Sequence, residues 1–227
     1  MTNRERIARK IAQDFRPDDG LINFGHGIPY SVPQYIDKSY RLSMLNEPGV
    51  IACGVCPPAE KGSPGERDMR DAMNRFCSAN EGGSFFDTVF SFSLIRGGHV
   101  NKSVLGGLQV DEAGSLANYA IPGQPITGIG GAMDLCTGAR EVLVAIETTA
   151  KDGSPKIVKQ CNYPITGVGC VDRIYTEVGV FTVEAGKGLT LIECFPDYEI
   201  EQIRKMVEPD FLVTPELKMI DLGVPLS

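Results

Sequence analysis

The fold is decided by residues 21–49, whose sequence is LINFGHGIPYSVPQYIDKSYRLSMLNEPG. Residues 21–24 predict a buried strand that ends at a glycine-rich turn, and residues 42–45 predict a second short strand that leads into the turn at 46–49. Between the two strands Ser31, with a proline close behind it, can open a helix. A strand, a helix and a second strand form a βαβ unit, in which the two strands pair in parallel.

The segments on either side extend this unit into a sheet that helices cover on both faces. A capping box at residues 2–5 predicts an N-terminal helix, residues 84–87 predict the cap of an apolar helix, and Asp197 can cap a last helix. Further strands are expected at 103–105, 141–147, 173–178, 180–183 and 189–194. We therefore expect a three-layer α/β/α fold on an open, mostly parallel mixed sheet. Residues 1–227 are expected to form one domain, with a variable polar excursion around residues 57–83.

The composition is that of a globular protein, with 42% hydrophobic and 22% charged residues. No apolar run approaches the roughly 18 residues that span a membrane, so no membrane partner is expected. The N-terminus passes directly into a charged amphipathic pattern rather than a signal peptide, which predicts a cytoplasmic location. The net charge of −7 argues against nucleic acid as a partner, because binding it requires a concentrated basic surface.

The cysteines do not indicate a metal or redox site. The chain has seven, an odd number, and the Cys-x-x-Cys pair at 53–56 has no second pair to complete a zinc site. His26 and His99 are the only histidines. We expect no metal, and we interpret the cysteines as small buried thiols.

Glycines and one glutamate are the candidate functional residues. Glycine-rich stretches occur at 25–29, 106–111 and 128–135. They could form tight turns, or they could let the backbone approach a ligand at the carboxyl ends of parallel strands. None matches a dinucleotide or phosphate-loop fingerprint. Glu47 ends an apolar strand and is followed at once by Pro-Gly, so it lies on a sharp turn, either as an exposed loop acid or as a site residue.

The segment NEPGVIACG at 46–54 resembles the Ser-Glu-Asn-Gly segment, with its trailing glycines, of the family I CoA-transferases, the 3-oxoacid and acetate/butyrate–acetoacetate type. Other segments resemble that family's β subunit in the same order over nearly the whole chain. They are FSLIRGGH at 92–99, VLGGLQVDE at 104–112, LANY at 116–119, GGAMDL at 130–135 and AKDGSPKI at 150–157. The resemblance implies the fold of CoA-transferases, which is also described as NagB-like.

The resemblance also implies a ping-pong transfer of CoA from an acyl-CoA to a short-chain carboxylic acid of the 3-oxo type, through a glutamyl-CoA thioester on Glu47. CoA esters would be substrates, and no cofactor would be bound permanently. The implied oxyanion and substrate pocket comprises Gly130, Gly131, Ala132, Gly25, His26, Gly27 and Gly49. Lys151 and Lys156 could contact the CoA phosphates, although loop lysines are usually only solvated.

Two positions depart from the family pattern. Pro48 stands where the family has asparagine, and His26 stands where common members have isoleucine. Two alternatives stay open: a CoA-thioester or ring-opening hydrolase of the same superfamily, and a non-catalytic scaffold subunit. Because the chain resembles only the β half, the resemblance implies a separate homologous α subunit, assembled as αβ or α2β2, with the active site between the two.

Overall fold

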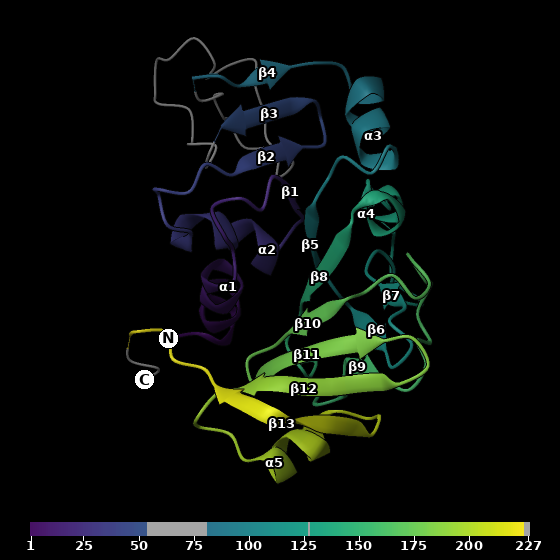
Figure 1. Ribbon diagram of the computed structural model, residues 1–227. Helices are drawn as coiled ribbons and strands as arrows, with labels where there is room; N and C mark the ends of the chain where they lie inside the picture. Colours follow the sequence, from purple (N-terminus) through teal and green to yellow (C-terminus); the bar gives the residue numbers. More distant parts are fainter. Residues whose placement is uncertain (54–80, 127, 225–227) are drawn as a thin grey trace.

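The computed structural model describes residues 1–53, 81–126 and 128–224, and these form three layers around one mixed sheet (Figure 1). The sheet has the strand order β13-β12-β11-β10-β8-β5-β1-β2-β3-β4. Its strands are β1 (Leu21–Phe24), β2 (Ser43–Asn46), β3 (Val50–Cys53), β4 (Ser84–Phe85), β5 (Lys102–Gly106), β8 (Glu141–Ala145), β10 (Arg173–Tyr175), β11 (Gly179–Glu184), β12 (Gly188–Cys194) and β13 (Phe211–Met219). A small separate sheet has the order β7 (Leu116–Ala117), β6 (Gln109–Asp111), β9 (Ile157–Val158).

The central strands β2, β1, β5, β8 and β10 are parallel to one another. Their carboxyl ends therefore lie along one edge of the sheet and their amino ends along the other. Strands β3 and β4 add antiparallel pairs beside β2, and β11 and β12 add antiparallel pairs beside β10. The predicted mostly parallel mixed sheet, and the parallel pairing of residues 21–24 with the strand before Glu47, are confirmed.

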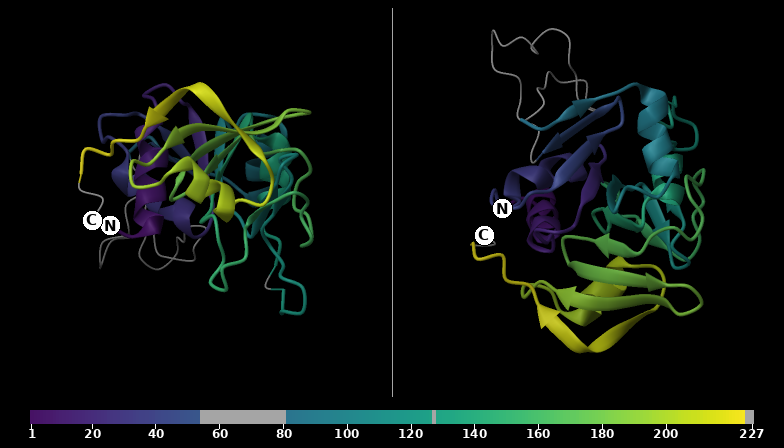
Figure 2. Two further views of the ribbon diagram at one scale, coloured as in Figure 1. Left: turned by 90° about the horizontal axis from the view of Figure 1, so that it is seen from below. Right: turned by 45° about the horizontal axis from the view of Figure 1, so that its top comes forward.

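Helices cover both faces of the sheet. They are α1 (Asn3–Gln13), α2 (Ile28–Ser31), the 3-10 helix η1 (Val32–Tyr35), α3 (Thr88–Arg96), α4 (Ala132–Gly138) and α5 (Ile200–Met206). Side chains alternate along each strand, so Leu143 of β8 packs in the cluster of α1 whereas Val144 packs in the cluster of α3 and α4. The views in Figures 1 and 2 agree in placing α1 on one side of the sheet and α3 with α4 on the other.

Three helix starts differ from the sequence prediction. The second helix begins at Ile28, directly after Gly27, which has φ +81°, and Ser31 lies at its end. Asp87 alone caps α3, because Ser84 is part of β4. Asp197 pairs with Arg6 of α1 at 2.8 Å, and Glu199 caps α5 through a capping box. The capping box of α1 at residues 2–5 is confirmed.

Most of the expected polar excursion at 57–83 lies outside the described residues. In the part of the chain that the structure describes, no helix is both long enough and apolar enough to span a bilayer. The four described free cysteines include Cys136, Cys161 and Cys194, which are buried as expected. The Cys-x-x-Cys pair extends beyond the described residues.

Candidate active site

Glu47 is the first residue of a three-residue hairpin loop between β2 and β3. The pairing of Asn46 with Val50 closes the hairpin, and the Gly49 N–H donates to the Asn46 carbonyl at 2.9 Å. Gly49 has φ +120°, and a Cβ there would collide with the Phe86 carbonyl oxygen, so only glycine fits. The loop therefore holds the backbone of Glu47 at the carboxyl end of a parallel strand.

Pro48 is compatible with this turn. The hydrogen bond that closes the turn comes from the N–H of Gly49 rather than from the residue before it. A proline at position 48 therefore removes no bond from the turn and restricts its backbone to one φ. The proline is therefore accommodated in the turn without the loss of its closing hydrogen bond.

The carboxyl group of Glu47 lies against the backbone of Gly131. A Cβ built on Gly131 would stand 2.6 Å from Glu47 Oε2 and 3.0 Å from Phe92 Cζ, so any larger residue would displace the carboxyl group. Gly131 is the N-cap of α4, and Phe92 belongs to α3, which packs beside α4. The structure thus brings together Glu47 and Gly131, two residues that the sequence analysis had assigned to one site.

Burial raises the pKa of Glu47 above its ordinary value, and it outweighs the groups that stabilise the charge. The charge of His26 and hydrogen bonds from the Asn23 side chain and the Gly131 backbone each lower the pKa, whereas Asp134 raises it. Asp134 is itself paired with Arg96, whose Nε donates to it at 2.6 Å. Glu47 is therefore a half-buried carboxyl group with N–H groups of Asn23 and Gly131 close by and with no ion-pair partner among the described residues.

The other predicted pocket residues lie after β1 and at the start of α4. Gly25 follows β1, and its N–H donates to the Val104 carbonyl of β5 at 2.8 Å. A Cβ at Gly106 would stand 3.1 Å from the His26 carbonyl oxygen, so the ends of β1 and β5 pack backbone against backbone. The positions of Gly27 and Gly130, both with positive φ, have open space where a side chain would stand, and Ala132 begins α4.

The two lysines are placed differently from each other. Lys151 is exposed in a turn beyond β8. Lys156 is partly buried, and desolvation lowers its pKa while Glu147 and Glu177 act in the opposite direction. The net effect is a lowered pKa, so burial outweighs the two carboxylates at Lys156. A contact of either lysine with CoA stays a prediction.

Sequence reasoning missed Asn23. It lies in the middle of β1, only 1% exposed, and it interacts with both Leu45 and Glu47. The available signal was a carboxamide inside the otherwise apolar sequence Leu-Ile-Asn-Phe. A buried polar side chain in a central strand needs a partner, and here the partners are the strand and side chain that form the site.

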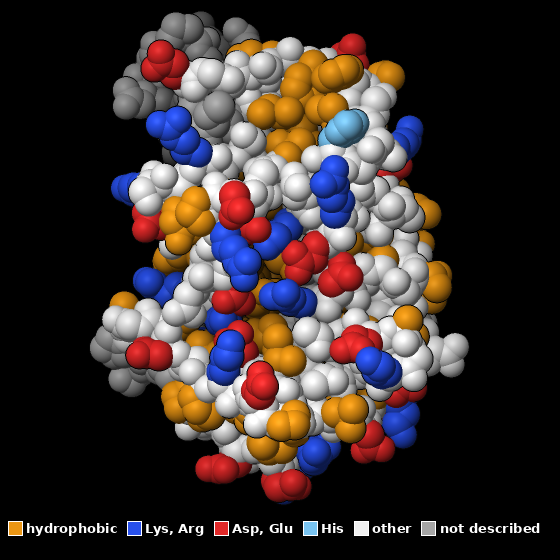
Figure 3. Space-filling model, viewed as in Figure 1, with side chains coloured by type: hydrophobic (Ala, Val, Ile, Leu, Met, Phe, Trp, Pro, Cys, Tyr) orange, Lys and Arg blue, Asp and Glu red, His pale blue; other side chains and the backbone are white. Residues whose placement is uncertain are grey.

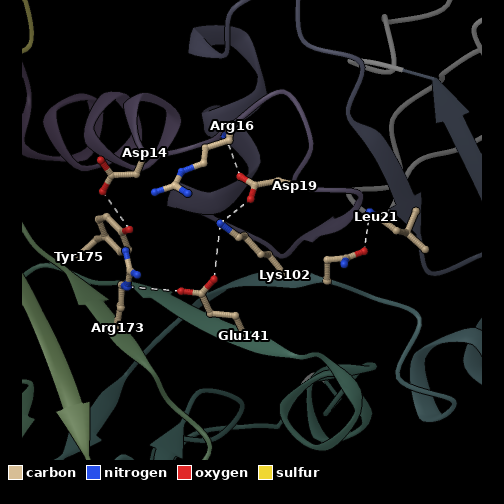
Figure 4. A network of polar contacts seen from close by, with 9 residues as sticks. Asp14, Arg16, Asp19, Leu21, Lys102, Glu141, Arg173 and Tyr175 are labelled. Atoms are coloured by element: carbon tan, nitrogen blue, oxygen red, sulfur yellow. Dashed lines mark hydrogen bonds and ion pairs between the residues drawn. The ribbon is translucent and has the colours of Figure 1, made fainter.

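The opposite, amino-terminal edge of the sheet carries a cluster of paired charges (Figure 4). Lys102, the first residue of β5, lies 2.8 Å from Asp19 and 3.5 Å from Glu141, and Glu141 also pairs with Arg173 at 3.3 Å. These residues line a hollow of about 550 Å³. Acidic and basic side chains also lie interspersed across the middle of the face shown in Figure 3. Since its charges neutralise one another, this hollow offers no single-sign site for a ligand.

The comparisons with known proteins point in the same direction as the site. The family model described as Coenzyme A transferase matches residues 4–206. The chain belongs to the coenzyme A transferase family. Acetate CoA-transferase subunit beta of Haemophilus influenzae is 39% identical over 98% of this chain and 97% of its own length. The predictions of a CoA-transferase and of a β-type chain are confirmed.

Other members of the CoA-transferase family are longer. Human mitochondrial succinyl-CoA:3-ketoacid coenzyme A transferase 2 is 37% identical over 98% of this chain, which spans only 42% of that protein. The crystal structure of an acyl-CoA transferase from Escherichia coli O157:H7 superposes with a TM-score of 0.75 at 22% identity, over 97% of this chain and 44% of that one. At that identity the superposition shows the shared fold alone. The chain thus spans less than half the length of each of these two proteins.

Proposed function

We propose that the chain is the glutamate-bearing subunit of an acyl-CoA:carboxylate CoA-transferase and that Glu47 is its covalent nucleophile. The observation that carries this proposal is the Glu47 carboxyl group, half-buried at the carboxyl end of β2 and packed against the Gly131 backbone. A carboxylate is a weak nucleophile in water, and it becomes effective when it is positioned and partly desolvated.

The reaction proceeds through two kinds of acyl intermediate. The Glu47 carboxylate attacks the carbonyl carbon of the acyl-CoA, the carbon–sulfur bond breaks, and a mixed anhydride and CoA thiolate form. The thiolate attacks the glutamyl carbonyl carbon, the anhydride carbon–oxygen bond breaks, and the first acid leaves as its carboxylate. The acceptor carboxylate then attacks the carbonyl carbon of the glutamyl thioester, the carbon–sulfur bond breaks, and a new mixed anhydride and CoA thiolate form. The thiolate attacks the acceptor's acyl carbon, the anhydride carbon–oxygen bond breaks, and Glu47 leaves as the free carboxylate while the new acyl-CoA is formed. Water takes no part, so the energy of the thioester is conserved.

Each of these attacks places negative charge on a carbonyl oxygen, which requires nearby N–H donors. The Gly131 N–H already interacts with the Glu47 carboxyl group, and the Ala132 N–H at the start of α4 is a further candidate donor. Gly27 and Gly130 have open space where a side chain would stand, which leaves room for a thioester, whereas Gly25 and Gly49 allow close packing of the backbone around the site. Lys151 is the better placed of the two lysines for a CoA phosphate, because it is exposed.

The proposed partner is a homologous α-type subunit, and the proposed acceptors are short-chain acids, 3-oxo acids among them. Support comes from the subunit name of the Haemophilus relative and from the human single-chain protein, of which this chain spans less than half. Expressed alone, the chain should turn over little; co-expressed with such a partner, it should exchange CoA. A screen of acyl-CoA donors against acetate, butyrate, acetoacetate and 3-oxoadipate would identify the acids.

The test is to trap the covalent intermediate. The full chain with its partner is incubated with acyl-CoA and no acceptor, treated with borohydride or hydroxylamine, and digested for mass spectrometry. The expected result is a modified Glu47 in the wild type and none in Glu47→Gln, with transfer abolished in that variant. Glu112→Gln, which changes an exposed carboxylate elsewhere, is the matched control and should behave as the wild type.

Other outcomes would assign a different function. An unmodified Glu47 despite turnover, with free CoA released when no acceptor is present, would contradict transfer and indicate a hydrolase. Full activity of the Glu47→Ala complex would indicate a scaffold subunit whose partner carries the chemistry.

A further inference from the structure

Asn23 occupies a position where the packing alone favours an apolar side chain. It lies in the central parallel strand β1 between two buried apolar residues, and it is 1% exposed. Its Nδ2 donates to the carbonyl oxygen of Leu45 at 3.1 Å, across the register that pairs these two residues in β1 and β2. Its Oδ1 is buried and has no hydrogen-bond partner among the described residues.

Stability does not explain this carboxamide. A buried, unpaired acceptor costs about 1–3 kcal/mol relative to a satisfied one, and an apolar side chain of the same shape would avoid that cost. Polar groups retained at such a cost call for a specific explanation, and a catalytic role is one of them.

The orientation of the amide is fixed by its neighbour. The Leu45 carbonyl is an acceptor, so the side-chain nitrogen rather than the oxygen must face it. One of the two Nδ2 hydrogens serves that bond. The second is not used by that bond, and the Asn23 side chain lies close enough to the Glu47 carboxyl group to lower its pKa. Asn23 is thus fixed to β2, the strand that leads into Glu47, with one N–H hydrogen left for an acceptor in the site.

We propose that Asn23 is a catalytic hydrogen-bond donor to Glu47, rigidly held by Leu45, and that it acts together with the backbone N–H of Gly131. This inference rests on the proposed function. In the resting protein the two donors hold the carboxylate in one orientation. When a thiolate or an acceptor carboxylate attacks the glutamyl carbonyl carbon, the negative charge develops on a Glu47 oxygen, where the same donors already lie. Preorganised donors of this kind contribute about 10²–10³-fold to the rate.

Two substitutions test the donor. Asn23→Leu removes the amide and the orphan oxygen, and Asn23→Asp keeps the shape. An aspartate lacks the second donor in either protonation state, because its single O–H, when present, is taken by the Leu45 carbonyl. In the complex with the partner subunit we expect kcat to fall about 10²–10³-fold in both variants. The KM for acyl-CoA should stay near the wild-type value, and the melting temperature of Asn23→Leu should equal or exceed that of the wild type.

Ser103→Ala is the matched control. Ser103 lies beside Asn23 in the register of β5, is fully buried, and also carries a side-chain oxygen without a partner among the described residues. Its loss removes a buried polar atom from the same row of the sheet and takes no donor from Glu47, so kcat should not change.

A second readout separates a donor from a merely structural residue. The rate of glutamyl-thioester formation is measured across pH by trapping and mass spectrometry. The pH at which this rate falls on the acidic side should be higher in Asn23→Leu than in the wild type. His26, Asp134 with its partner Arg96, and the Gly131 N–H also face Glu47 and are unchanged in that variant. If the wild type forms the thioester and either Asn23 variant forms it within about threefold of the wild-type rate, the role of Asn23 is overturned while the proposed function stands. If the wild type forms none, the proposed function itself fails.

Discussion

The two edges of the central sheet differ in whether their charged side chains have ion-pair partners. At the amino ends of the parallel strands, Lys102 is partly buried between Asp19 and Glu141, and Glu141 has a second cation in Arg173. At the carboxyl ends, Glu47 is half-buried with N–H donors but no ion-pair partner among the described residues. Removing one member of a partly buried ion pair destabilises a fold because the other charge is left uncompensated, whereas a half-buried carboxyl group without an ion-pair partner is typical of a reactive site. The comparison therefore locates stability at one edge and chemistry at the other.

The largest effect on activity, apart from the loss of the nucleophile, should come from Gly131→Ala. The added Cβ would stand 2.6 Å from Glu47 Oε2, and the carboxyl group must move. Gly131 has φ −88°, so alanine adds no backbone strain. We expect kcat to fall about 10²–10³-fold, because a shift of an ångström is enough to misplace a reacting group. The melting temperature should change little.

Steady-state kinetics and thermal unfolding of the complex check this expectation. Thr137→Ala, at the exposed far end of the same helix, is the control and should retain both properties. A Gly131→Ala variant with wild-type kcat would show that the contact seen here does not fix the nucleophile.

The amino-terminal edge should show the reverse pattern. Lys102→Met leaves Asp19 and Glu141 without their shared cation, and the side chain of Lys102 is only 20% exposed. We expect the free energy of unfolding to fall by about 1–3 kcal/mol, between the values for exposed and fully buried pairs. Urea denaturation measures this change, and kcat should stay at the wild-type level.

Lys187→Met provides the matched control, because its ion pair with Glu184 is exposed on both sides. Its effect should be about 0–1 kcal/mol. Equal losses in the two lysine variants would refute a stabilising role for the Lys102 cluster.

How far the sequence predicts these two edges depends on the residue. Local apolar patterns predicted the strand before Glu47 and its parallel pairing with residues 21–24. The Pro-Gly pair predicted the sharp turn at Glu47. Local sequence patterns could not predict the contact of Glu47 with Gly131, because the two residues are far apart in the chain and meet only through the packing of α3 and α4. Only the family resemblance placed both residues in one site. Asn23 was visible as an anomaly in β1, but its meaning depends on which backbone carbonyl lies opposite.

The helix caps were misassigned because they, too, depend on contacts between residues that are distant in the sequence. Ser84, Asp87 and Asp197 are good caps by residue type, but only Asp87 caps a helix, and Glu199, which residue type does not favour, caps α5 because Asp197 is paired with Arg6. Strand β13 was missed because it is a partly exposed edge strand that contains Pro215, which interrupts the usual alternation. The amino-terminal charge cluster was also unpredicted, since each member belongs to a different strand or turn.

A smaller effect concerns stability at the active-site edge. The pKa of Glu47 is raised in the folded chain, so its ionisation destabilises the fold above that pKa, and the penalty is absent below the ordinary pKa of a glutamate. Glu47→Gln should therefore be more stable than the wild type at neutral pH, by less than the Lys102 effect, and the difference should disappear as the pH falls. Thermal unfolding across this pH range measures it. A destabilised Glu47→Gln at neutral pH would contradict the contrast between the edges.

The smallest effect expected is that of His26 on the pH dependence of transfer. Glu47 reacts as the carboxylate, so kcat/KM falls as the pH drops through the pKa of Glu47. The positive charge of His26, while the imidazole is protonated, lowers that pKa. His26→Gln removes the charge at similar size, and the acid limb should therefore move to higher pH, with the rate on the plateau nearly unchanged. His99→Gln is the control, because His99 is exposed beyond α3 and is not among the groups that shift the pKa of Glu47. An acid limb that stays in place in His26→Gln would mean that the imidazole charge does not reach the nucleophile, and Asn23 and Gly131 would then be its whole electrostatic support.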